Sequence, residues 1–260
     1  HITYNNFFDT ETAQKILTDH GKIDIITFTN VFAHIEDLPT LLKNVDLLLK
    51  VDATLVVENH YLGTVLDTGQ FDTFYHEHPR TYSEKSFRYI ASSLKRRVSK
   101  IEYVSRYGGN IRVFINAGAE VEPIKNESKF LAKFETMGSE IKAWADLTRE
   151  KITKLVDKHG PLHAKAFPGR AAILVKLLGL STDQVRVVYE ITGSKKVGHY
   201  LPGTRIPIEP EINLFTLPLL EQPEIILNLA WHLPNEVRTN LAANNCSALV
   251  VDIMEMKRES

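Results

Sequence analysis

Residues 22–35 read KIDIITFTNVFAHI, and residues 53–62 read ATLVVENHYL. Each segment begins with an apolar run and ends in polar side chains, which predicts two buried strands. Between them, residues 37–50 (DLPTLLKNVDLLLK) carry apolar side chains at helical spacing after Pro39. Two buried strands joined by a helix indicate a parallel, doubly wound α/β sheet.

A further helix is predicted before the first of these strands. In DTETAQKILTDHG (residues 9–21), Asp9 or Thr10 can cap the helix, Glu11 suits its first turn and Gly21 ends it. Ligands of doubly wound sheets bind beyond the carboxyl ends of the strands. Polar residues occupy these ends in both predicted strands: Thr29, Asn30 and His34 after the first, and Glu58, Asn59 and His60 after the second.

The middle of the chain predicts a helix, a hairpin and a long charged helical stretch. TYSEKSFRYIASSLKRRVS (81–99) predicts the helix, and IEYVSRYGGNIRVFINAG (101–118) predicts two strands that turn at residues 107–110. The charged stretch runs from residue 125 to residue 159, and we expect a break near Gly138.

The second half repeats the alternation of helices and strands. VRVVYEI (185–191), EIILNLAW (224–231) and SALVVDIM (247–254) predict strands, and GRAAILVKLLGL and PNEVRTNLAANN predict helices. We therefore divide the chain into a first domain of residues 1–121 and a second, Rossmann-like α/β domain of residues 122–260.

The composition is that of an ordinary globular protein, with 43% hydrophobic and 24% charged residues. The net charge of −1 gives no general reason to expect nucleic acid or a membrane surface as a partner. Cys246 is the only cysteine, which excludes an internal disulfide or a cysteine-rich zinc site within this chain. A single cysteine also fits a reducing compartment, so we expect a cytoplasmic protein.

The stretch QFDTFYHEHPRTYS (residues 70–83) places Tyr75, His76, Glu77 and His78 side by side. Histidine can accept a proton near neutral pH, a carboxylate can orient an imidazole, and a phenol can hydrogen-bond an oxyanion. His76 and His78 alternate as metal ligands on a strand do, but no cysteine cluster or helical His-x-x-x-His pair accompanies them, so we predict no metal. The remaining alternative is a polar surface loop that caps the next helix.

Five segments resemble the sugar C-methyltransferases in their order and spacing. They are TNVFAHIEDL (29–38), QFDTFYHEHPRTYS (70–83), RYGGNIRVF (106–114), VVYEITGSKKVGHYLPGTRIPI (187–208) and PEIILNLAWHLPNEV (223–237). That family transfers a methyl group from S-adenosylmethionine to nucleotide-activated deoxyketosugars. The resemblance implies part of a methyltransferase-like sheet in the first domain, nucleotide-sugar binding by the second, and a role in deoxysugar biosynthesis.

The resemblance also implies roles for individual residues of the first domain. By it, His78 is the general base that removes a proton alpha to the sugar ketone, and Tyr75 and Glu77 position the sugar. His34 falls where the family places a second active-site histidine. The methyl donor would lie at the strand end that carries Thr29 and Asn30.

The second domain would hold the nucleotide diphosphate of the substrate. Arg170 follows Gly169 at the start of a predicted helix, a place suited to phosphate. Lys196, Tyr200 and Arg205 lie in the loop KKVGHYLPGTRIPI, which matches the family. The alternative is that these basic residues belong to a solvated loop.

The sequence departs from the family pattern in two places. FPGRAAIL (167–174) stands where many members have Gly-Ala-x-Ala-Lys-Gly, so that Arg170 replaces a lysine. The family's cysteine-rich zinc domain and glycine-rich donor loop have no counterpart in residues 1–28, where Gly21 is the only glycine. We therefore expect an incomplete S-adenosylmethionine site in this chain: the rest belongs to a missing N-terminal segment or to a partner chain, or the protein is a degenerate form.

Two alternatives to methyl transfer stay open on the sequence alone. A nucleotide-sugar-binding protein would keep the substrate site without using the methyl donor. An isomerase or epimerase would use the same proton-abstracting residues without transferring a methyl group.

Overall fold

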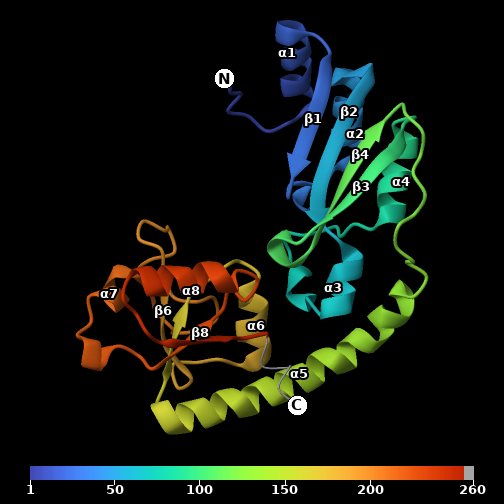
Figure 1. The fold of residues 1–260 in the computed structure, drawn as a ribbon. Coiled ribbons are helices and arrows are strands. Elements are labelled where there is room, and N and C mark those ends of the chain that lie inside the picture. The colour runs from blue at the N-terminus through green and yellow to red at the C-terminus, as the bar shows by residue number, and fades with distance from the viewer. Residues whose placement is uncertain (255–260) are drawn as a thin grey trace. The chain divides into compact units, whose positions relative to one another are not determined.

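The computed structural model describes residues 1–254, and the chain divides into two compact units (Figure 1). The first unit runs from His1 to Met137, and the second begins at Gly138. Each unit has its own sheet, with four strands in the first and five in the second. The domain limits 1–121 and 122–260 stay a prediction, because a compact unit need not end where an evolutionary domain ends.

The first unit alternates helices with strands. Its elements are α1 (Thr10–His20), β1 (Ile23–Thr29), η1 (Phe32–His34), α2 (Leu38–Leu48), β2 (Leu49–His60), α3 (Leu62–Thr68), η2 (Phe71–Thr73), α4 (Glu84–Ser93), β3 (Arg97–Val104), η3 (Arg106–Gly108) and β4 (Asn110–Asn116). The predicted helices, strands and hairpin of this region are confirmed, although α4 ends earlier than expected. Asp9 caps α1, because its side chain accepts a hydrogen bond from the Thr12 amide at 2.8 Å.

The first sheet brings two strand ends and one turn to the same edge. Its strand order is β1-β2-β4-β3, with β1 and β2 parallel and β4 antiparallel to β2 and β3. β1 and β2 therefore end at the edge where β4 begins. The register pairs Thr29 with Glu58 and His60 with Asn110. The parallel arrangement is thus confirmed for β1 and β2, whereas the hairpin makes the other half of the sheet antiparallel.

β1 is more exposed than the sequence predicts. Ile25 is 61% exposed, whereas Ile26 and Phe28 pack against the core of the unit. β1 is the edge strand of this sheet and pairs with β2. The prediction of a buried strand is therefore wrong for the face that carries Ile25. A short apolar run does not distinguish a strand covered on both faces from an edge strand.

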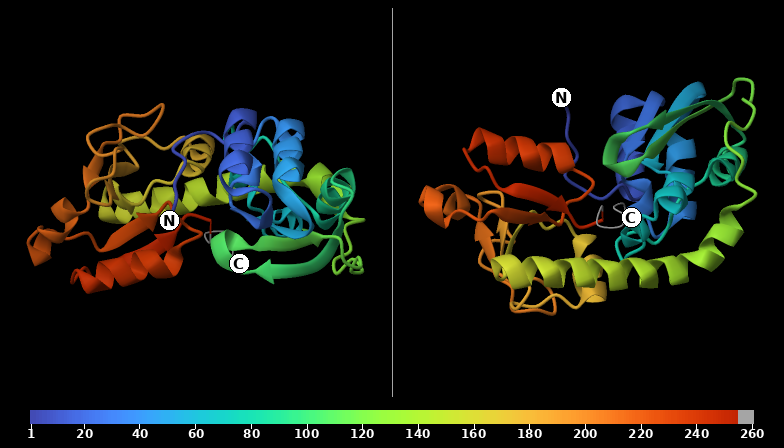
Figure 2. Two further views of the ribbon diagram at one scale, coloured as in Figure 1. Left: turned by 90° about the horizontal axis from the view of Figure 1, so that it is seen from above. Right: turned by 60° about the horizontal axis from the view of Figure 1, so that its bottom comes forward.

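The core of the first unit lies between the sheet and the helices α2 and α4. Val45 of α2 and Phe87 of α4 are fully buried together with Leu55 of β2 and Val113 of β4. α1 packs beside α2, as Figure 2 shows. Because these helices hold one face of the sheet, the polar carboxyl edge of β1 and β2 keeps a fixed position relative to the core.

The segment after β4 is fastened to the start of α4. The buried carboxylate of Glu84 accepts hydrogen bonds from the backbone amides of Ile124 and Lys125, at 3.0 and 2.8 Å. Glu127 accepts from the amide of Glu84 at 2.7 Å and from the hydroxyl of Tyr61 at 3.2 Å. These reciprocal contacts explain why residues beyond 121 belong to the first compact unit.

The second unit is a separate α/β layer structure. Its elements are the later part of α5 (Phe130–His159), β5 (Leu162–Lys165), α6 (Ala171–Leu178), β6 (Val185–Glu190), β7 (Ile208–Pro210), α7 (Ile212–Phe215), η4 (Leu219–Glu221), β8 (Ile225–Asn228), α8 (Pro234–Ala243) and β9 (Leu249–Asp252). In neither unit, over residues 1–254, does a helix have the length and apolar character needed to cross a membrane.

The second sheet is entirely parallel, in the order β7-β6-β5-β8-β9. Consecutive residues of its inner strands are buried, such as Val187 and Val188 in β6 and Ile226 and Leu227 in β8. Such strands are covered on both faces, as the doubly wound class requires. In this sheet the chain runs from the central strand β5 outwards to β6 and β7, and then continues on the other side of β5 with β8 and β9. The point between β5 and β8 is therefore the topological switch point, where ligands bind at the carboxyl edge.

The long helix α5 is continuous through Gly138, so the predicted break at this residue is wrong. A single glycine inside a helix costs only about 0.5–1 kcal/mol relative to alanine. The neighbouring residues of α5 overcome that cost. The helix ends as predicted, at Gly160, whose φ of 73° needs a residue without a side chain.

Replacing Gly138 by alanine is therefore expected to stabilise the protein by about 0.5–1 kcal/mol. A Cβ at this position meets no atom within 4 Å, so the gain is not offset by a clash. Gly160→Ala is the matched control, and it should destabilise by about 1–2 kcal/mol because of its left-handed backbone. Urea unfolding followed by the fluorescence of the buried Trp144 of α5 measures both. A loss of stability in Gly138→Ala would contradict a continuous helix.

Candidate active site

Four ring side chains meet beside the carboxyl edge of the first sheet. The ring of His78 lies 4.7 Å from that of His34, 5.6 Å from that of His60 and 4.5 Å from that of Tyr75, between centroids. His34 ends the turn η1 that follows β1, and His60 ends β2. The structure thus brings together three of the four residues predicted to be catalytic and adds His60 to them.

The tautomer of His78 follows from its hydrogen bond. Its Nδ1 lies 3.0 Å from the backbone oxygen of Thr73. A carbonyl oxygen only accepts, so Nδ1 carries the hydrogen and donates it. Nε2 is then the unprotonated nitrogen of the neutral ring. A histidine held in this tautomer by a backbone carbonyl is well arranged to accept a proton at Nε2.

Glu77, the fourth predicted catalytic residue, lies at the rim of this group. Its Oε2 accepts a hydrogen bond from the hydroxyl of Tyr75 at 3.1 Å. The Glu77 side chain is 52% exposed, and the neighbouring His76 side chain is 88% exposed. Glu77 can therefore orient the Tyr75 phenol. The His76 ring lies 5.7 Å from that of Tyr75 between centroids and is otherwise exposed to solvent.

The loop that carries these residues is anchored near both of its ends. Gln70 Nε2 donates to the backbone oxygen of Gly108 at 2.6 Å, and a Cβ at Gly108 would lie 2.6 Å from Gln70 Oε1. At the other end, the Tyr82 hydroxyl donates to the backbone oxygen of Phe32 at 3.1 Å. Burial raises the pKa of Tyr82 to about 12, so this donor stays protonated. Both anchors fix the approach of His78 to the strand ends.

A polar network ties the ends of β1 and β2 to the start of β4. Asn110 Nδ2 donates to Asn30 Oδ1 and to Glu58 Oε1, both at 3.0 Å. Arg112 Nε donates to Glu58 Oε2 at 2.8 Å. Burial alone would raise the pKa of Glu58, but the hydrogen bonds from Asn110 and Arg112 outweigh it and hold this pKa below its ordinary value. Thr29, next to Asn30, is exposed at the end of β1.

The carboxyl edge of the second sheet also carries polar residues, and several of them pair. Lys165, at the end of β5, forms a buried ion pair with Glu211 at 2.5 Å. Glu190, at the end of β6, accepts from the amide of Phe167 at 2.9 Å. Asn228 Nδ2, at the end of β8, donates to Asp252 Oδ1 at 2.5 Å. These pairs hold the loops of this edge in place.

The four predicted substrate-binding residues lie in loops of the second unit and take part in three separate contacts. Arg170 is 6% exposed, and its guanidinium lies 5.0 Å from the ring centroid of Trp231, which follows β8. Lys196 Nζ donates to the backbone oxygen of Phe167 at 2.5 Å, in the loop that leads to Arg170. Farther along the chain, Arg205 contacts the ring of Tyr200, 5.9 Å from its centroid. These are separate contacts: Arg170 with Trp231, Lys196 with Phe167, and Arg205 with Tyr200.

Trp231 and His60 are the site residues that the sequence left unassigned. Trp231 directly follows a predicted strand, and His60 ends one, so both occupy the positions where doubly wound sheets bind ligands. Their positions at strand ends are the feature of the sequence that could have identified both as candidate site residues. Their neighbours in space, Arg170 and His78, come from distant parts of the chain and could not be paired with them by pattern alone.

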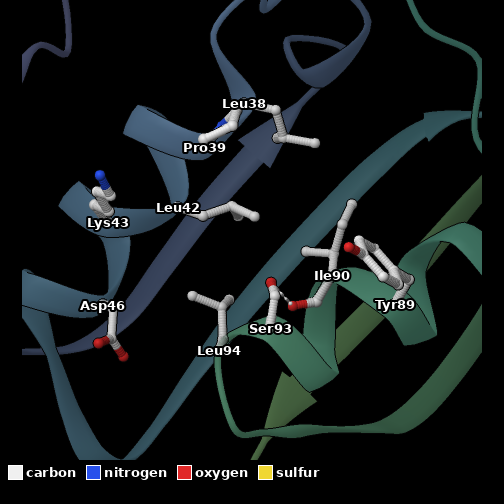
Figure 3. A pocket seen from close by; sticks show the side chains of 9 residues that line it. All are labelled: Leu38, Pro39, Leu42, Lys43, Asp46, Tyr89, Ile90, Ser93 and Leu94. Carbon is white, nitrogen blue, oxygen red and sulfur yellow. Dashed lines mark hydrogen bonds between the residues drawn. The ribbon is translucent and has the colours of Figure 1, made fainter.

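Two of the cavities formed by the described residues lie apart from these side chains. The first, of about 320 Å³, separates α2 from α4 (Figure 3) and is lined by Leu38, Pro39, Leu42, Lys43, Asp46, Tyr89, Ile90, Ser93 and Leu94. The second, of about 580 Å³, lies at the opposite end of β5 from Lys165 and includes His159 and Arg186. Neither is lined by a predicted catalytic residue. Within residues 1–254, no group of three or more His, Cys, Asp or Glu side chains is arranged to hold a metal ion.

Comparison with known proteins identifies the class. Residues 105–252, more than half of the chain, match the family described as the C-methyltransferase C-terminal domain, and residues 2–101 match the methyltransferase domain. The chain therefore belongs to the C-methyltransferase family. It is 30% identical over 248 residues to the C-methyltransferase NovU of Streptomyces niveus. The match covers 90% of this chain and 57% of that relative's length.

Proposed function

We propose that the protein transfers a methyl group from S-adenosylmethionine to a carbon atom alpha to the keto group of a nucleotide-linked deoxyketosugar. Membership of the C-methyltransferase family supports the reaction class. The observation that carries the chemistry is the hydrogen bond from His78 Nδ1 to the Thr73 oxygen, which leaves Nε2 as a base. The substrate class rests on the sequence resemblance to the sugar C-methyltransferases.

His78 begins the reaction in this proposal. Its Nε2 takes the proton from the carbon alpha to the ketone, and the electron pair of the broken C–H bond moves into an enolate. The Tyr75 hydroxyl, which donates its hydrogen to Glu77 in the structure, turns that hydrogen to the oxygen on which charge develops when the sugar is bound. His34, exposed to water beside His78, provides a neighbouring imidazole that can pass the captured proton to solvent.

The residues at the end of β1 suit the methyl donor. S-adenosylmethionine, when bound, supplies an electrophilic methyl carbon whose bond to sulfur breaks as its bond to the sugar carbon forms. Thr29 and Asn30 would hold it. Asn110 already donates to Asn30, and its own Oδ1 is buried without a hydrogen-bond partner among residues 1–254. A buried acceptor at this position fits a donating group such as a ribose hydroxyl or an ammonium group.

Isotope labelling tests the proposed reaction directly. The full-length protein is incubated with a thymidine-diphosphate 4-keto-6-deoxysugar and methyl-labelled S-adenosylmethionine. We expect the label to appear on a ring carbon next to the ketone, and the alpha proton to exchange with deuterated water. Exchange without any methylation would favour an isomerase or epimerase, and the absence of both would favour a binding protein.

We assign the nucleotide part of the substrate to the second unit because of the sequence resemblance to the sugar C-methyltransferases. Thymidine or uridine diphosphate should raise the thermal stability of that unit, and Arg170→Ala or Lys196→Ala should reduce the shift. Losing one charge-assisted phosphate contact should cost about 1.5–3 kcal/mol of binding free energy. Lys176→Ala is the matched control, because Lys176 lies in the last turn of the helix that begins after Arg170. Equal shifts in all variants and the wild type would contradict the assignment.

A further inference from the structure

A buried amide interrupts an apolar row in β2. Leu55, Val57 and Tyr61 face the core and are at most 3% exposed, and Asn59 takes the position between Val57 and Tyr61 in this row. Its partner in the ladder is the fully buried Ile111 of β4. Asn59 is itself only 1% exposed. An apolar side chain would fit the pattern of this row, so the amide needs another explanation.

Neither polar atom of Asn59 is hydrogen-bonded within the described part of the chain. Both Nδ2 and Oδ1 are shielded from water, and neither has a partner among residues 1–254. Buried polar groups of folded proteins are nearly always paired, and an unpaired one destabilises the fold relative to an apolar group of the same shape. A residue that keeps such a group at the ligand-binding edge of a sheet is expected to pair with a ligand.

The position of Asn59 connects it with the proposed site. The next residue, His60, contacts the ring of His78, and the preceding residue, Glu58, belongs to the network with Asn110 and Arg112. A second buried amide at this edge is unpaired at one of its two polar atoms. Gln70, at the start of the loop 70–83 that carries His78, is 2% exposed and has no hydrogen-bond partner for its Oε1 among residues 1–254.

We propose that Asn59 is a substrate-binding residue that hydrogen-bonds a hydroxyl group of the sugar. A primary amide offers both a donor and an acceptor, and a hydroxyl group complements both. The side chains that shield Asn59 move aside when the sugar enters from the carboxyl edge of β2. This inference rests on the proposed function, since it names a further residue for the same substrate.

The test is Asn59→Leu, which replaces the amide by an apolar group of similar size. The variant should raise the melting temperature of the ligand-free protein by about 2–6 °C, because an unpaired amide is removed. It should also raise the KM for a thymidine-diphosphate 4-keto-6-deoxysugar by about 10- to 100-fold, with the rate of alpha-proton exchange at saturation nearly unchanged. Affinity for thymidine diphosphate, which lacks the sugar, should not change.

Asn44→Leu is the matched control. Asn44 lies in α2, is 2% exposed, and its Nδ2 also has no hydrogen-bond partner among residues 1–254. This control should gain stability in the same way while the KM stays at the wild-type value. A lower melting temperature in Asn59→Leu would show that its amide is paired within the fold and would overturn the inference. An unchanged KM in Asn59→Leu would overturn it as well.

The outcomes separate this inference from the proposed function. If the wild type neither exchanges the alpha proton nor transfers methyl, the proposed function fails. If the wild type does both and Asn59→Leu weakens S-adenosylmethionine rather than the sugar, only the assignment of Asn59 to the sugar fails.

Discussion

Replacing His78 by asparagine should slow exchange of the sugar's alpha proton by about a hundred- to ten-thousand-fold, the usual cost of losing a general base. The asparagine amide can still donate a hydrogen bond towards Thr73, as Nδ1 of His78 does at 3.0 Å. The loop can therefore keep its shape while the proton acceptor at Nε2 is lost. Exchange in deuterated water without methyl donor isolates the abstraction step, and binding of thymidine diphosphate should change little.

His76→Asn makes the same replacement at the neighbouring histidine. Its side chain is 88% exposed, and its ring lies 5.7 Å from that of Tyr75. His76 has no role in the proposed proton transfer, so exchange should stay within about twofold of the wild type. Tyr75→Phe removes only a hydroxyl and should slow exchange less than His78→Asn does. If His78→Asn exchanged the proton as fast as the wild type, the base would lie elsewhere, and His34 would be the next candidate.

The helices and strands were predictable where the pattern is local. β2 is a long apolar run that ends in polar residues, and α1 has a capping residue and a terminal glycine, so short-range rules place both. β5 escaped prediction because it is short and contains Lys165. The partner that allows this lysine to be buried, Glu211, lies 46 residues later. No local pattern reveals that pair.

Within the candidate site, the loop of residues 70–83 was likewise predictable only in part. The identities of Tyr75, Glu77 and His78 and their link to His34 follow from the family resemblance. The proximity of His60 does not, because it depends on the chain returning to the end of β2, where the amide of Leu62 donates to the backbone oxygen of Tyr82 at 2.8 Å. The tautomer of His78 likewise needs the position of a backbone oxygen.

Arg112→Leu is expected to destabilise the first unit by about 2–4 kcal/mol, because it leaves a buried carboxylate without its cation. The Glu58 side chain is 3% exposed, and Arg112 Nη2 lies 2.6 Å from its Oε2. Arg97→Leu is the control. Arg97 is 63% exposed and pairs with Glu120 at 3.3 Å, so its loss should cost about 0–1 kcal/mol. Both tryptophans, Trp144 and Trp231, lie in the second unit, so amide hydrogen exchange in β2 and β4 is the suitable measurement.

The pH dependence of the stability lost in Arg112→Leu shows whether the unpaired charge of Glu58 causes that loss. In the wild type, the pKa of Glu58 is held below its ordinary value, so the carboxylate adds stability above about pH 4.3 that is lost as the pH falls through the folded pKa. Without Arg112, burial should raise this pKa, and the ionised carboxylate then destabilises the fold at neutral pH. Protonation at low pH removes both effects. The difference in stability between the wild type and Arg112→Leu should therefore be largest near pH 7 and shrink towards pH 4. A difference that stays constant over this range would show that lost packing, and not the uncompensated charge of Glu58, causes the instability.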